Sequence, residues 1–273
     1  MSASQATWPM ITQADFQKIS RFAHDHFGLE LPAGKEGLVN ARLGKKMRQG
    51  GFATFADYYS HVHSDRTGQA LLGLIDALTT NFTAFLREPA HFDFLRQAAA
   101  EFRDARPLRV WSAACSSGEE PYSIAMTLLA AGRDAVEITA SDISTRVLKV
   151  GQDAVYPAER FRGIPEEWRR AFLLKGTGPK EGSFKIKPRV AGLIKFERRN
   201  LMEPLPSRKF HFIFCRNVMI YFNRATQQSI VERFTPCLEP GGYLFVGHSE
   251  SLNGIQHTLR YIKPSVYKNE RIK

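Results

Sequence analysis

Cysteine is scarce in this chain of 273 residues, and its three cysteines, Cys115, Cys215 and Cys237, lie far apart. Their spacing matches no zinc-binding pattern, and their odd number does not suit a set of disulfide bonds. The sequence therefore predicts reduced, buried thiols and no bound metal.

Long apolar stretches are missing as well. No apolar run approaches the roughly 18 residues that a membrane-spanning helix needs. The first residues, MSASQATWPM, lack the positive start and apolar centre of a secretion signal. We therefore expect a cytoplasmic protein that is not inserted in a membrane. Its 43% hydrophobic and 24% charged residues are ordinary for a globular protein with one large or two modest domains.

The glycine pattern of a dinucleotide site is also absent. The stretch RVWSAACSSGEEPYSIAM, residues 109–126, reads as strand, short loop and helix, but Gly118 is its one glycine. This disfavours a nicotinamide-dependent dehydrogenase, which needs G-x-G-x-x-G at that place. Small loop residues would still let the backbone approach a ligand closely. An ordinary strand-to-helix turn, with Pro121 opening the helix, explains the same residues.

The chemistry of the first helical turn narrows the choice of ligand. Glu119 and Glu120 stand there with no Lys or Arg, so a pyrophosphate would be repelled. A cationic or zwitterionic ligand fits better, and S-adenosylmethionine has an ammonium group, a sulfonium and a ribose. We therefore expect an adenosyl cofactor at this loop if it binds a ligand.

Acidic residues are outnumbered 27 to 38, which gives a net charge of +11. Residues 1–85 hold 8 basic and 7 acidic residues, so most of the excess lies in residues 86–273. One basic cluster nevertheless stands in the first part, at Lys35, Arg42, Lys45, Lys46 and Arg48. Such a cluster is typical of a solvated helix face. The alternative is docking onto an acidic surface, either nucleic acid or a carboxylate-rich protein.

Helical patterns fill the first 80 residues, and no strand pattern appears among them. Thr12 and Asp15 form a capping box before a helix near 13–27 that Gly28 ends. Leu38, Leu43 and Met47 are expected to line a second, basic helix, and two further helices follow. The sequence predicts an all-helical N-terminal domain over residues 1–80.

Strand and helix patterns alternate after that, which predicts an α/β fold with a mostly parallel sheet. The predicted strands are 108–113, 136–141, 194–198, 210–215 and 243–248, and the predicted helices are 120–131, 144–151, 165–174 and 224–238. Residues 81–95 are interpreted as a linker that contributes to the cofactor site, and residues 96–273 as the main domain. Glycines and a Lys-rich hairpin pattern predict a small antiparallel appendage over residues 176–199.

Polar residues follow several predicted strands, where α/β folds keep their ligands. Asp142 lies 24 residues after Gly118, a suitable place for an acid that binds the ribose, although it would as readily cap a helix. Asn200 offers an amide for an adenine edge, with Leu201 beneath the ring, although an Asn there is more often a turn residue. Arg216 and Asn217, followed by Tyr221, end the fourth strand.

Six blocks of the chain carry a resemblance to a known family. They are NFTAFLRE (81–88), WSAACSSGEEPYS (111–123), ASDIS (140–144), NLMEP (200–204), FCRNVMIYF (214–222) and GHSES (247–251). In this order they resemble the chemotaxis receptor methyltransferases, the CheR family. The resemblance implies a class I, Rossmann-like S-adenosylmethionine-dependent methyltransferase with a helical N-terminal domain and a small antiparallel β-subdomain. It implies methylation of glutamate side chains in chemoreceptors for sensory adaptation, and no metal.

The resemblance also implies the roles of individual residues. The residues expected to line the cofactor site are Asn81, Thr83, Arg87, Glu120, Asp142, Asn200, Leu201, Arg216 and Asn217. Arg87 and Tyr221 are expected to act in catalysis, by orienting the cofactor and the incoming carboxylate. A plain linker is the alternative for the segment around Arg87. Arg42, Lys45, Lys46 and Arg48 are expected to bind the substrate.

The expected partner is the helical bundle of a chemoreceptor's cytoplasmic domain, to which a monomer would be recruited. The full-length loop from Gly176 to Gly182 favours binding of a receptor's C-terminal peptide as well, since a short loop accompanies loss of that binding in the family. Two alternatives remain open. The charge of +11 suits a nucleic-acid methyltransferase, although Cys215–Arg216–Asn217–Val218 lacks the Asp/Asn-Pro-Pro-aromatic pattern of enzymes that methylate base nitrogens. A non-catalytic cofactor-binding adaptor is the other.

Overall fold

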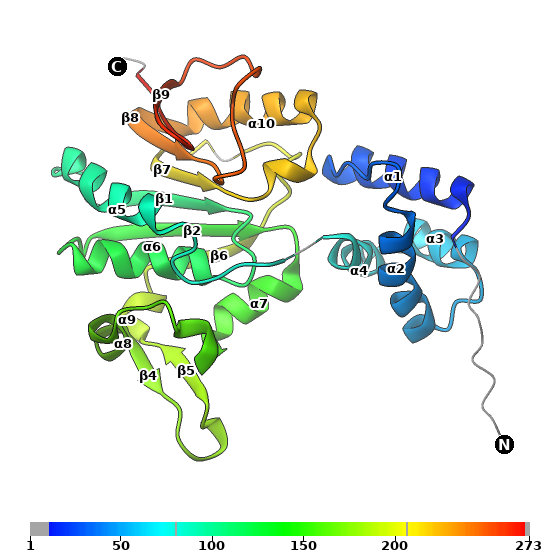
Figure 1. The fold of residues 1–273 in the computed structure, drawn as a ribbon, viewed down its shortest axis with the longest axis horizontal. Helices are drawn as coiled ribbons and strands as arrows, with labels where there is room; N and C mark the ends of the chain where they lie inside the picture. The colour runs from blue at the N-terminus through cyan, green and yellow to red at the C-terminus, as the bar shows by residue number, and fades with distance from the viewer. Residues whose placement is uncertain (1–10, 80, 206, 271–273) are drawn as a thin grey trace. The chain divides into compact units, whose positions relative to one another are not determined.

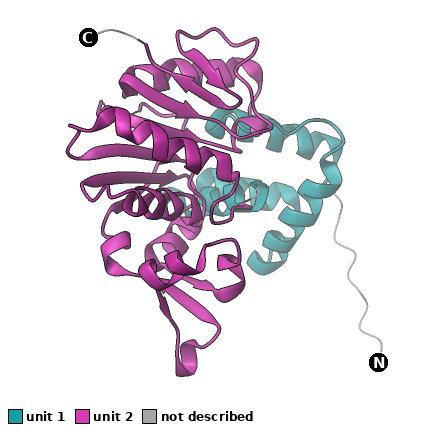
Figure 2. Ribbon diagram, turned by 60° about the vertical axis from the view of Figure 1, so that its left-hand side comes forward, with its two compact units in different colours: residues 1–80 teal, residues 81–273 magenta. Residues whose placement is uncertain are grey.

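The computed structural model describes residues 11–79, 81–205 and 207–270, so the prediction made for the first ten residues lies outside them. The chain divides into two compact units, residues 1–80 and residues 81–273 (Figure 2). Among the described residues, no helix combines the length and the apolar character that crossing a bilayer demands.

Helices build the first unit. Over residues 11–79 they are α1 (Gln13–Phe27), α2 (Glu36–Gly50), α3 (Phe55–Ser64) and α4 (Gln69–Leu78) (Figure 1). The capping box of α1 is confirmed, since the Thr12 hydroxyl accepts from the Asp15 N–H and Asp15 accepts from the Thr12 N–H. Gly28 ends α1 with a φ of 68°, which glycine adopts without strain.

The buried face of α2 differs from the prediction. Val39, Leu43 and Met47 are buried there, whereas Leu38 is 45% exposed. Residues four apart lie on one face of a helix, and Leu38 is rotated away from that row by about 100°. The exposed side of α2 therefore carries Leu38 together with Lys45 and Arg48.

A seven-stranded sheet forms the centre of the second unit, in the order β6-β2-β1-β7-β8-β10-β9. Its strands are β1 (Leu108–Ala113), β2 (Val136–Asp142), β6 (Ile194–Arg198), β7 (Phe210–Cys215), β8 (Leu238–Phe245), β9 (Arg260–Lys263) and β10 (Val266–Lys268). The first five of these pair in parallel and β10 runs antiparallel, which confirms the predicted sheet type. β8 starts at Leu238, five residues before the predicted strand 243–248, and a register shift between Phe210 and Phe212 accommodates the extra residues.

Helices cover both faces of this sheet (Figure 1). On one face α5 (Pro89–Ala98) and α6 (Glu119–Ala130) pack on a core that includes Val110 and Phe212, and α7 (Thr145–Asp153) packs on β2 and β6. On the other face α10 (Arg224–Cys237) packs on Trp111 and Ile213. Adjacent strand residues thus enter opposite cores, as the alternation of side chains along a strand requires.

Residues 81–95 are not the linker that the sequence suggested. Phe85 is buried and stacks on Phe161 with a centroid distance of 4.5 Å. Phe92 and Leu95 lie on α5 and belong to the same core as the sheet. The segment is therefore an integral part of the second unit.

The small antiparallel sheet exists, but its predicted bounds of 176–199 are wrong. It contains β3 (Val155–Pro157), β4 (Leu173–Lys175) and β5 (Ser183–Ile186), in the order β3-β5-β4. The chain between β3 and β4 forms η2 (Ala158–Phe161) and α8 (Glu166–Phe172), and η3 (Gly178–Lys180) precedes β5. After β5 the predicted hairpin pattern does not continue as a strand. Pro188–Ala191 form α9, because Pro188 suits a first helical position and cannot donate to a ladder.

Candidate functional site

The carboxyl ends of three neighbouring strands lie side by side in the large sheet. Ala113, the last residue of β1, is in register with Ser141 on β2 and with Cys215 on β7. The connection after β1 leads to β2, its neighbour on one side. β7, the neighbour on the other side, comes much later in the sequence. In open α/β sheets, ligands bind at the edge where connections diverge in this way.

Asp142 shapes the loop after β1. Its carboxylate accepts from the Ser116 N–H at 2.9 Å and from the Ser144 N–H at 2.9 Å, and the residue is buried. The N-cap of α7 is Ser144, whose hydroxyl accepts from the Val147 N–H, so Asp142 is not itself the cap. Ser116 has a φ of 50°, an unfavourable value for a residue with a side chain. The carboxylate therefore holds a strained loop, and ribose binding by Asp142 stays a prediction.

Gly118 is required for packing. A Cβ there would lie 2.9 Å from the Tyr156 hydroxyl and 3.0 Å from the Gly151 Cα, and the φ of Gly118 is 95°. The close approach expected between this glycine and a ligand is thus, in this structure, an approach to α7 and β3.

A buried guanidinium lies at the end of β7. The Arg216 side chain is only 1% exposed and donates to Glu120 at 2.9 Å and to Glu88 at 2.8 Å. Asn217 follows with a φ of 57° and donates its amide to Glu88 at 3.2 Å. The Ser112 hydroxyl donates to Glu120 at 2.7 Å. One cation thus links two acids from different elements, which fixes the loop after β7 against α6.

The pKa values of the two acids in this network are shifted in opposite directions. Burial would raise the pKa of Glu88, but hydrogen bonds from Arg216 and Asn217 outweigh it and lower that pKa to about 2. Burial raises the pKa of Glu120, and its hydrogen bonds with Arg216 and Ser112 only partly oppose this. At neutral pH, Glu88 is therefore ionised beside Arg216, whereas burial acts against the charge of Glu120.

The segment 81–88 is fixed along its backbone. The Asn81 carbonyl accepts from the Ser116 hydroxyl at 3.1 Å, and the Thr83 carbonyl accepts from Arg160 at 3.2 Å. The Leu86 N–H donates to the Ser123 hydroxyl at 2.9 Å. Arg87 donates to the Phe82 carbonyl at 2.9 Å, and its guanidinium lies over the Phe82 ring. The segment is therefore an ordered border of the loop after β1.

Hydrogen bonds gather seven of the predicted cofactor residues into three groups at the carboxyl edge. Ser116 joins Asn81 to Asp142, and Thr83 contacts Arg160. The third group contains Arg87, Glu120 and Asn217, which are joined through Arg216 and Glu88. Asn200 and Leu201 follow β6, the neighbour of β2. The Asn200 side chain accepts from the Met202 N–H at 3.0 Å, as in a turn, and Leu201 is buried in the α10 core. Tyr221 lies on η4 (Met219–Tyr221) and is half-buried.

The predicted substrate residues lie on α2, in the first unit, and differ in exposure. Arg42 is half-buried and donates to the Leu78 carbonyl at 2.8 Å, so it stabilises the C-terminus of α4. Lys46 is half-buried, whereas Lys45 and Arg48 are exposed. Lys45 and Arg48 are therefore the members best placed to meet a partner.

Four residues that contribute to the site were missed from the sequence. Glu88 and Glu250 lie inside two of the quoted blocks, so a signal for them existed. The Tyr156 hydroxyl donates to the Ser117 carbonyl at 2.7 Å, and Arg160 reaches Glu119 at 3.4 Å. No sequence pattern pointed to Tyr156 or Arg160, because both belong to the small-sheet region, far along the chain from the loop that they contact.

The polar groups at this edge of the sheet suit S-adenosylmethionine. The carboxylates of Asp142, Glu88 and Glu120 match a ligand with cationic groups and ribose hydroxyls. The Arg216 Nε–H is buried, and no described residue accepts from it. Such a donor fits a ligand carboxylate. A phosphate-rich ligand would instead meet several buried acids.

Family models match almost the whole chain. Residues 81–268 match the SAM-binding domain of CheR methyltransferase, and residues 14–79 match its all-alpha domain. The chain belongs to the CheR methyltransferase family. It is similar to chemotaxis protein methyltransferase 2 of Pseudomonas aeruginosa, with 40% identity over 94% of this chain and 93% of that protein. It is also similar to the chemotaxis protein methyltransferase of Escherichia coli, with 37% identity over 94% of this chain and 91% of that protein.

This membership decides several predictions. As a CheR methyltransferase, the chain is an enzyme that uses S-adenosylmethionine, and its cofactor domain is the second unit. The predicted resemblance, fold class and cofactor are confirmed. The dehydrogenase alternative is wrong.

Proposed function

We propose that this enzyme methylates glutamate side chains in the cytoplasmic domains of chemoreceptors and forms γ-glutamyl methyl esters for sensory adaptation. The observation that carries the proposal is the CheR match over the whole cofactor domain, whose carboxyl edge holds the buried Glu88–Arg216–Glu120 network. The enzyme would act in the cytoplasm as a monomer recruited to membrane receptors.

Individual residues have proposed roles in holding the cofactor. Asp142 would accept from the ribose hydroxyls, Asn200 would bind the adenine edge, and Leu201 would lie beneath the ring. The unpaired Arg216 Nε–H would meet the carboxylate of the methionine moiety. When bound, the cofactor supplies an electrophilic methyl group on a sulfonium.

The residues of the site are consistent with a methyl acceptor that needs no activation by a general base. A glutamate side chain has a pKa of about 4.3 and is already ionised at neutral pH, so no general base is required. Burial raises the pKa of the Cys115 and Cys215 thiols, which keeps them protonated and unsuited to nucleophilic attack. The work left to the protein is orientation and the exclusion of water. We assign orientation of the incoming carboxylate to Arg87 and Tyr221.

A transfer assay tests the proposal. The enzyme is incubated with S-adenosylmethionine labelled in the methyl group and with a receptor cytoplasmic fragment, and the product is then treated with alkali. Release of labelled methanol identifies a methyl ester. Alkali-stable label would contradict the proposal and indicate methylation of nitrogen. Labelling of nucleic acid in place of the receptor would favour the nucleic-acid alternative, and no transfer to any substrate would favour the adaptor.

Arg87 allows a sharper version of this assay. Loss of the guanidinium in Arg87→Ala should abolish most of the transfer, while Arg87→Lys keeps the charge and loses only the bidentate geometry. The control is Arg96→Ala, an exposed arginine on α5. Wild-type rates in Arg87→Ala would remove Arg87 from the reaction.

The small sheet supports a second role, the binding of a receptor's C-terminal peptide. β5 is its central strand, so β3 and β4 are the edge strands to which a peptide could add. Val155 on β3 and Leu174 on β4 are exposed apolar side chains, 36% and 47% respectively. Such a tether would raise the local concentration of substrate without touching the reacting glutamate. Deletion of Gly178–Gly182 should abolish binding in a peptide titration and leave S-adenosylmethionine binding intact, and a flat titration with the wild-type protein would contradict the tether.

A further inference from the structure

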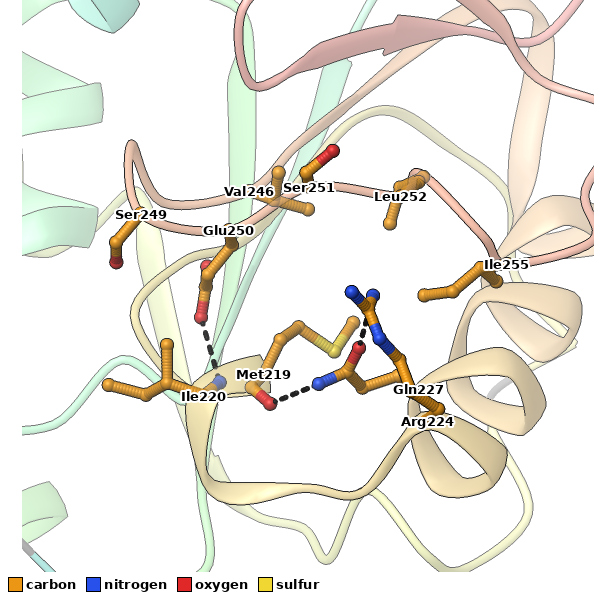
Figure 3. A pocket seen from close by; sticks show the side chains of 10 residues that line it. All are labelled: Met219, Ile220, Arg224, Gln227, Val246, Ser249, Glu250, Ser251, Leu252 and Ile255. Carbon is orange, nitrogen blue, oxygen red and sulfur yellow. Dashed lines mark hydrogen bonds between the residues drawn. The ribbon is translucent and has the colours of Figure 1, made fainter.

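A pocket of about 250 Å³ lies between η4, the first turns of α10 and the loop that follows β8 (Figure 3). The residues that line it are Met219, Ile220, Arg224, Gln227, Val246, Ser249, Glu250, Ser251, Leu252 and Ile255. None of these ten is assigned a role in binding the cofactor. The pocket is nevertheless next to the reaction region, because η4 carries Tyr221 and Glu250 accepts from the Asn217 N–H at 2.8 Å.

One side of the pocket is apolar. Met219, Leu252 and Ile255 are buried residues of the α10 core, and their side chains face the hollow (Figure 3). Aliphatic and thioether groups of this kind favour contact with methylene groups of a ligand.

The positive charge of the pocket comes from Arg224. Its guanidinium extends towards Leu252 and Ile255, and its Nη1 donates to the Gln227 Oε1 at 3.3 Å (Figure 3). Gln227 is itself held in place, since its amide donates to the Met219 and Phe222 carbonyls, both at 2.9 Å. A fixed amide thus orients an exposed guanidinium over an apolar wall.

The acid in the lining does not cancel this charge. Burial raises the pKa of Glu250, and backbone N–H groups oppose that rise. Its carboxylate accepts from the N–H groups of Asn217, Gly247 and Ile220, and it points to the side of the pocket away from Arg224 (Figure 3). Its acceptors are directed at the backbone, and Arg224 remains available to an incoming anion.

The loop after β8 is already ordered in the free protein. The Glu250 N–H donates to the Gly247 carbonyl at 2.9 Å, and the Ile255 N–H donates to the Leu252 carbonyl at 3.1 Å. The Tyr267 hydroxyl accepts from the Leu252 N–H at 3.1 Å. A preformed pocket loses little conformational freedom when it binds a side chain.

We propose that this pocket binds a second acidic side chain of the protein substrate, beside the glutamate that receives the methyl group. The methylene stem would pack on Met219, Leu252 and Ile255, and the carboxylate would pair with Arg224. The identity of the substrate as an acidic receptor segment rests on the proposed function, and a basic enzyme of net charge +11 complements such a segment.

The first test is kinetic and uses the full-length enzyme with a receptor cytoplasmic fragment. Arg224→Glu should raise the KM for the fragment roughly tenfold, as expected for loss of a charge-assisted contact. Its kcat and its S-adenosylmethionine affinity should stay near wild type, and Arg224→Lys should lie close to wild type. The control is Arg103→Glu, which makes the same change of net charge at an exposed residue outside the pocket and outside the small sheet. An equal rise of KM in Arg224→Glu and Arg103→Glu would overturn the proposal.

The second test does not depend on methyl transfer, so its result stands even if the proposed function fails. Enzyme with labelled methyl groups is titrated with butyrate, which has an aliphatic stem and one carboxylate, and the methyl resonances of Met219, Leu252 and Ile255 are followed by NMR. Butyrate should shift them in the wild type and not in Arg224→Glu. Butylamine, which has the same stem and the opposite charge, should not shift them, and inorganic phosphate should do so more weakly. Equal shifts with butylamine or phosphate, or none with butyrate, would contradict the site.

Discussion

Asp142 has two roles to reconcile, because the carboxylate proposed to bind a ribose also holds two backbone N–H groups. In Asp142→Asn, the amide group would face one of these donors. We expect the free energy of unfolding to fall by about 1–3 kcal/mol, the usual cost of leaving a buried donor unpaired. We also expect weaker binding of S-adenosylmethionine. Thermal unfolding and calorimetry measure the two effects, with the exposed Asp134→Asn as control. Unchanged values of both would contradict this account of the loop.

His91 gives the second unit a pH-dependent stability. Burial and the nearby charge of Arg216 lower its pKa from 6.5 to about 3. Between these values the unfolded chain binds a proton that the folded protein does not, so the free energy of unfolding falls as the pH drops below 6.5. Glu88 acts in the same direction at lower pH, because its stabilising effect is lost as the pH falls from 4.5 towards 2.

In His91→Leu, the free energy of unfolding should therefore fall less steeply between pH 6.5 and 4.5. In this range His91 contributes more than Glu88 to the dependence of stability on pH. Urea unfolding at several pH values measures the slope. His63→Leu, a change at an exposed histidine of α3, serves as the control. A slope equal to that of the wild type would show that His91 takes up its proton in the folded protein.

Sequence reasoning found the residues that end strands better than it found their partners. Arg216, Asn217 and Asp142 were identifiable because each follows a predicted strand and lies in a recognised block. That Arg216 contacts Glu88 and Glu120 follows from the pairing of β1 with β7, which brings together residues about 100 apart in the chain. The contact between Arg42 and the Leu78 carbonyl was not foreseen, because a charged residue on a helix looks solvent-exposed until the neighbouring helix end is known. Substrate binding by Arg42 stays a prediction.

Strand β3 connects the small sheet to the loop after β1. Tyr156→Phe removes the hydroxyl that donates to the Ser117 carbonyl and leaves that carbonyl without this donor. We expect weaker binding of S-adenosylmethionine by calorimetry, while circular dichroism stays unchanged. The matched control is Tyr261→Phe, because Tyr261 is 57% exposed. Unaltered cofactor affinity in Tyr156→Phe would mean that the loop holds its shape without the small sheet.

Substitutions at exposed and half-buried positions of helix α2 should have different effects, the former on substrate recognition and the latter on stability. Reversing Lys45 and Arg48 to Glu should raise the KM for a receptor fragment and reduce the salt dependence of the rate, because exposed charges are screened within about 10 Å at 0.1 M salt. Arg42→Ala should instead lower the melting temperature, because the Leu78 carbonyl loses its donor. Methylation assays at several salt concentrations and thermal unfolding distinguish the two. A salt-insensitive wild-type rate would argue against recognition by α2.

Long elements were predictable and short ones were not. The bounds of α1 and of β1 were found because their periodic patterns run over several residues. β3 and β4 have three residues each, too few for an alternating pattern to be visible. The small sheet was consequently placed too late in the chain, around the one strand, β5, that has a clear pattern.

The division into two units has a testable consequence for the whole enzyme. Every residue proposed to hold the cofactor lies in residues 81–273, and this unit has its own cores. A fragment of residues 81–273 should therefore bind S-adenosylmethionine with the affinity of the full chain but methylate a receptor fragment more slowly. Calorimetry and the transfer assay measure the two properties. Loss of cofactor binding in a fragment that is folded by circular dichroism would show that the first unit completes the site.

The pairing of β1 with β7 has a consequence for the synthesis of the protein. Val110 pairs with Phe212, so β1 leaves the ribosome long before β7, one of its two neighbours, exists. At about 5–20 residues per second, the apolar strand around Trp111 waits roughly 5–20 s for its partner. The first unit, whose helices form from local contacts, is complete before this interval begins. We therefore expect the nascent second unit to depend on chaperones more than the first unit does.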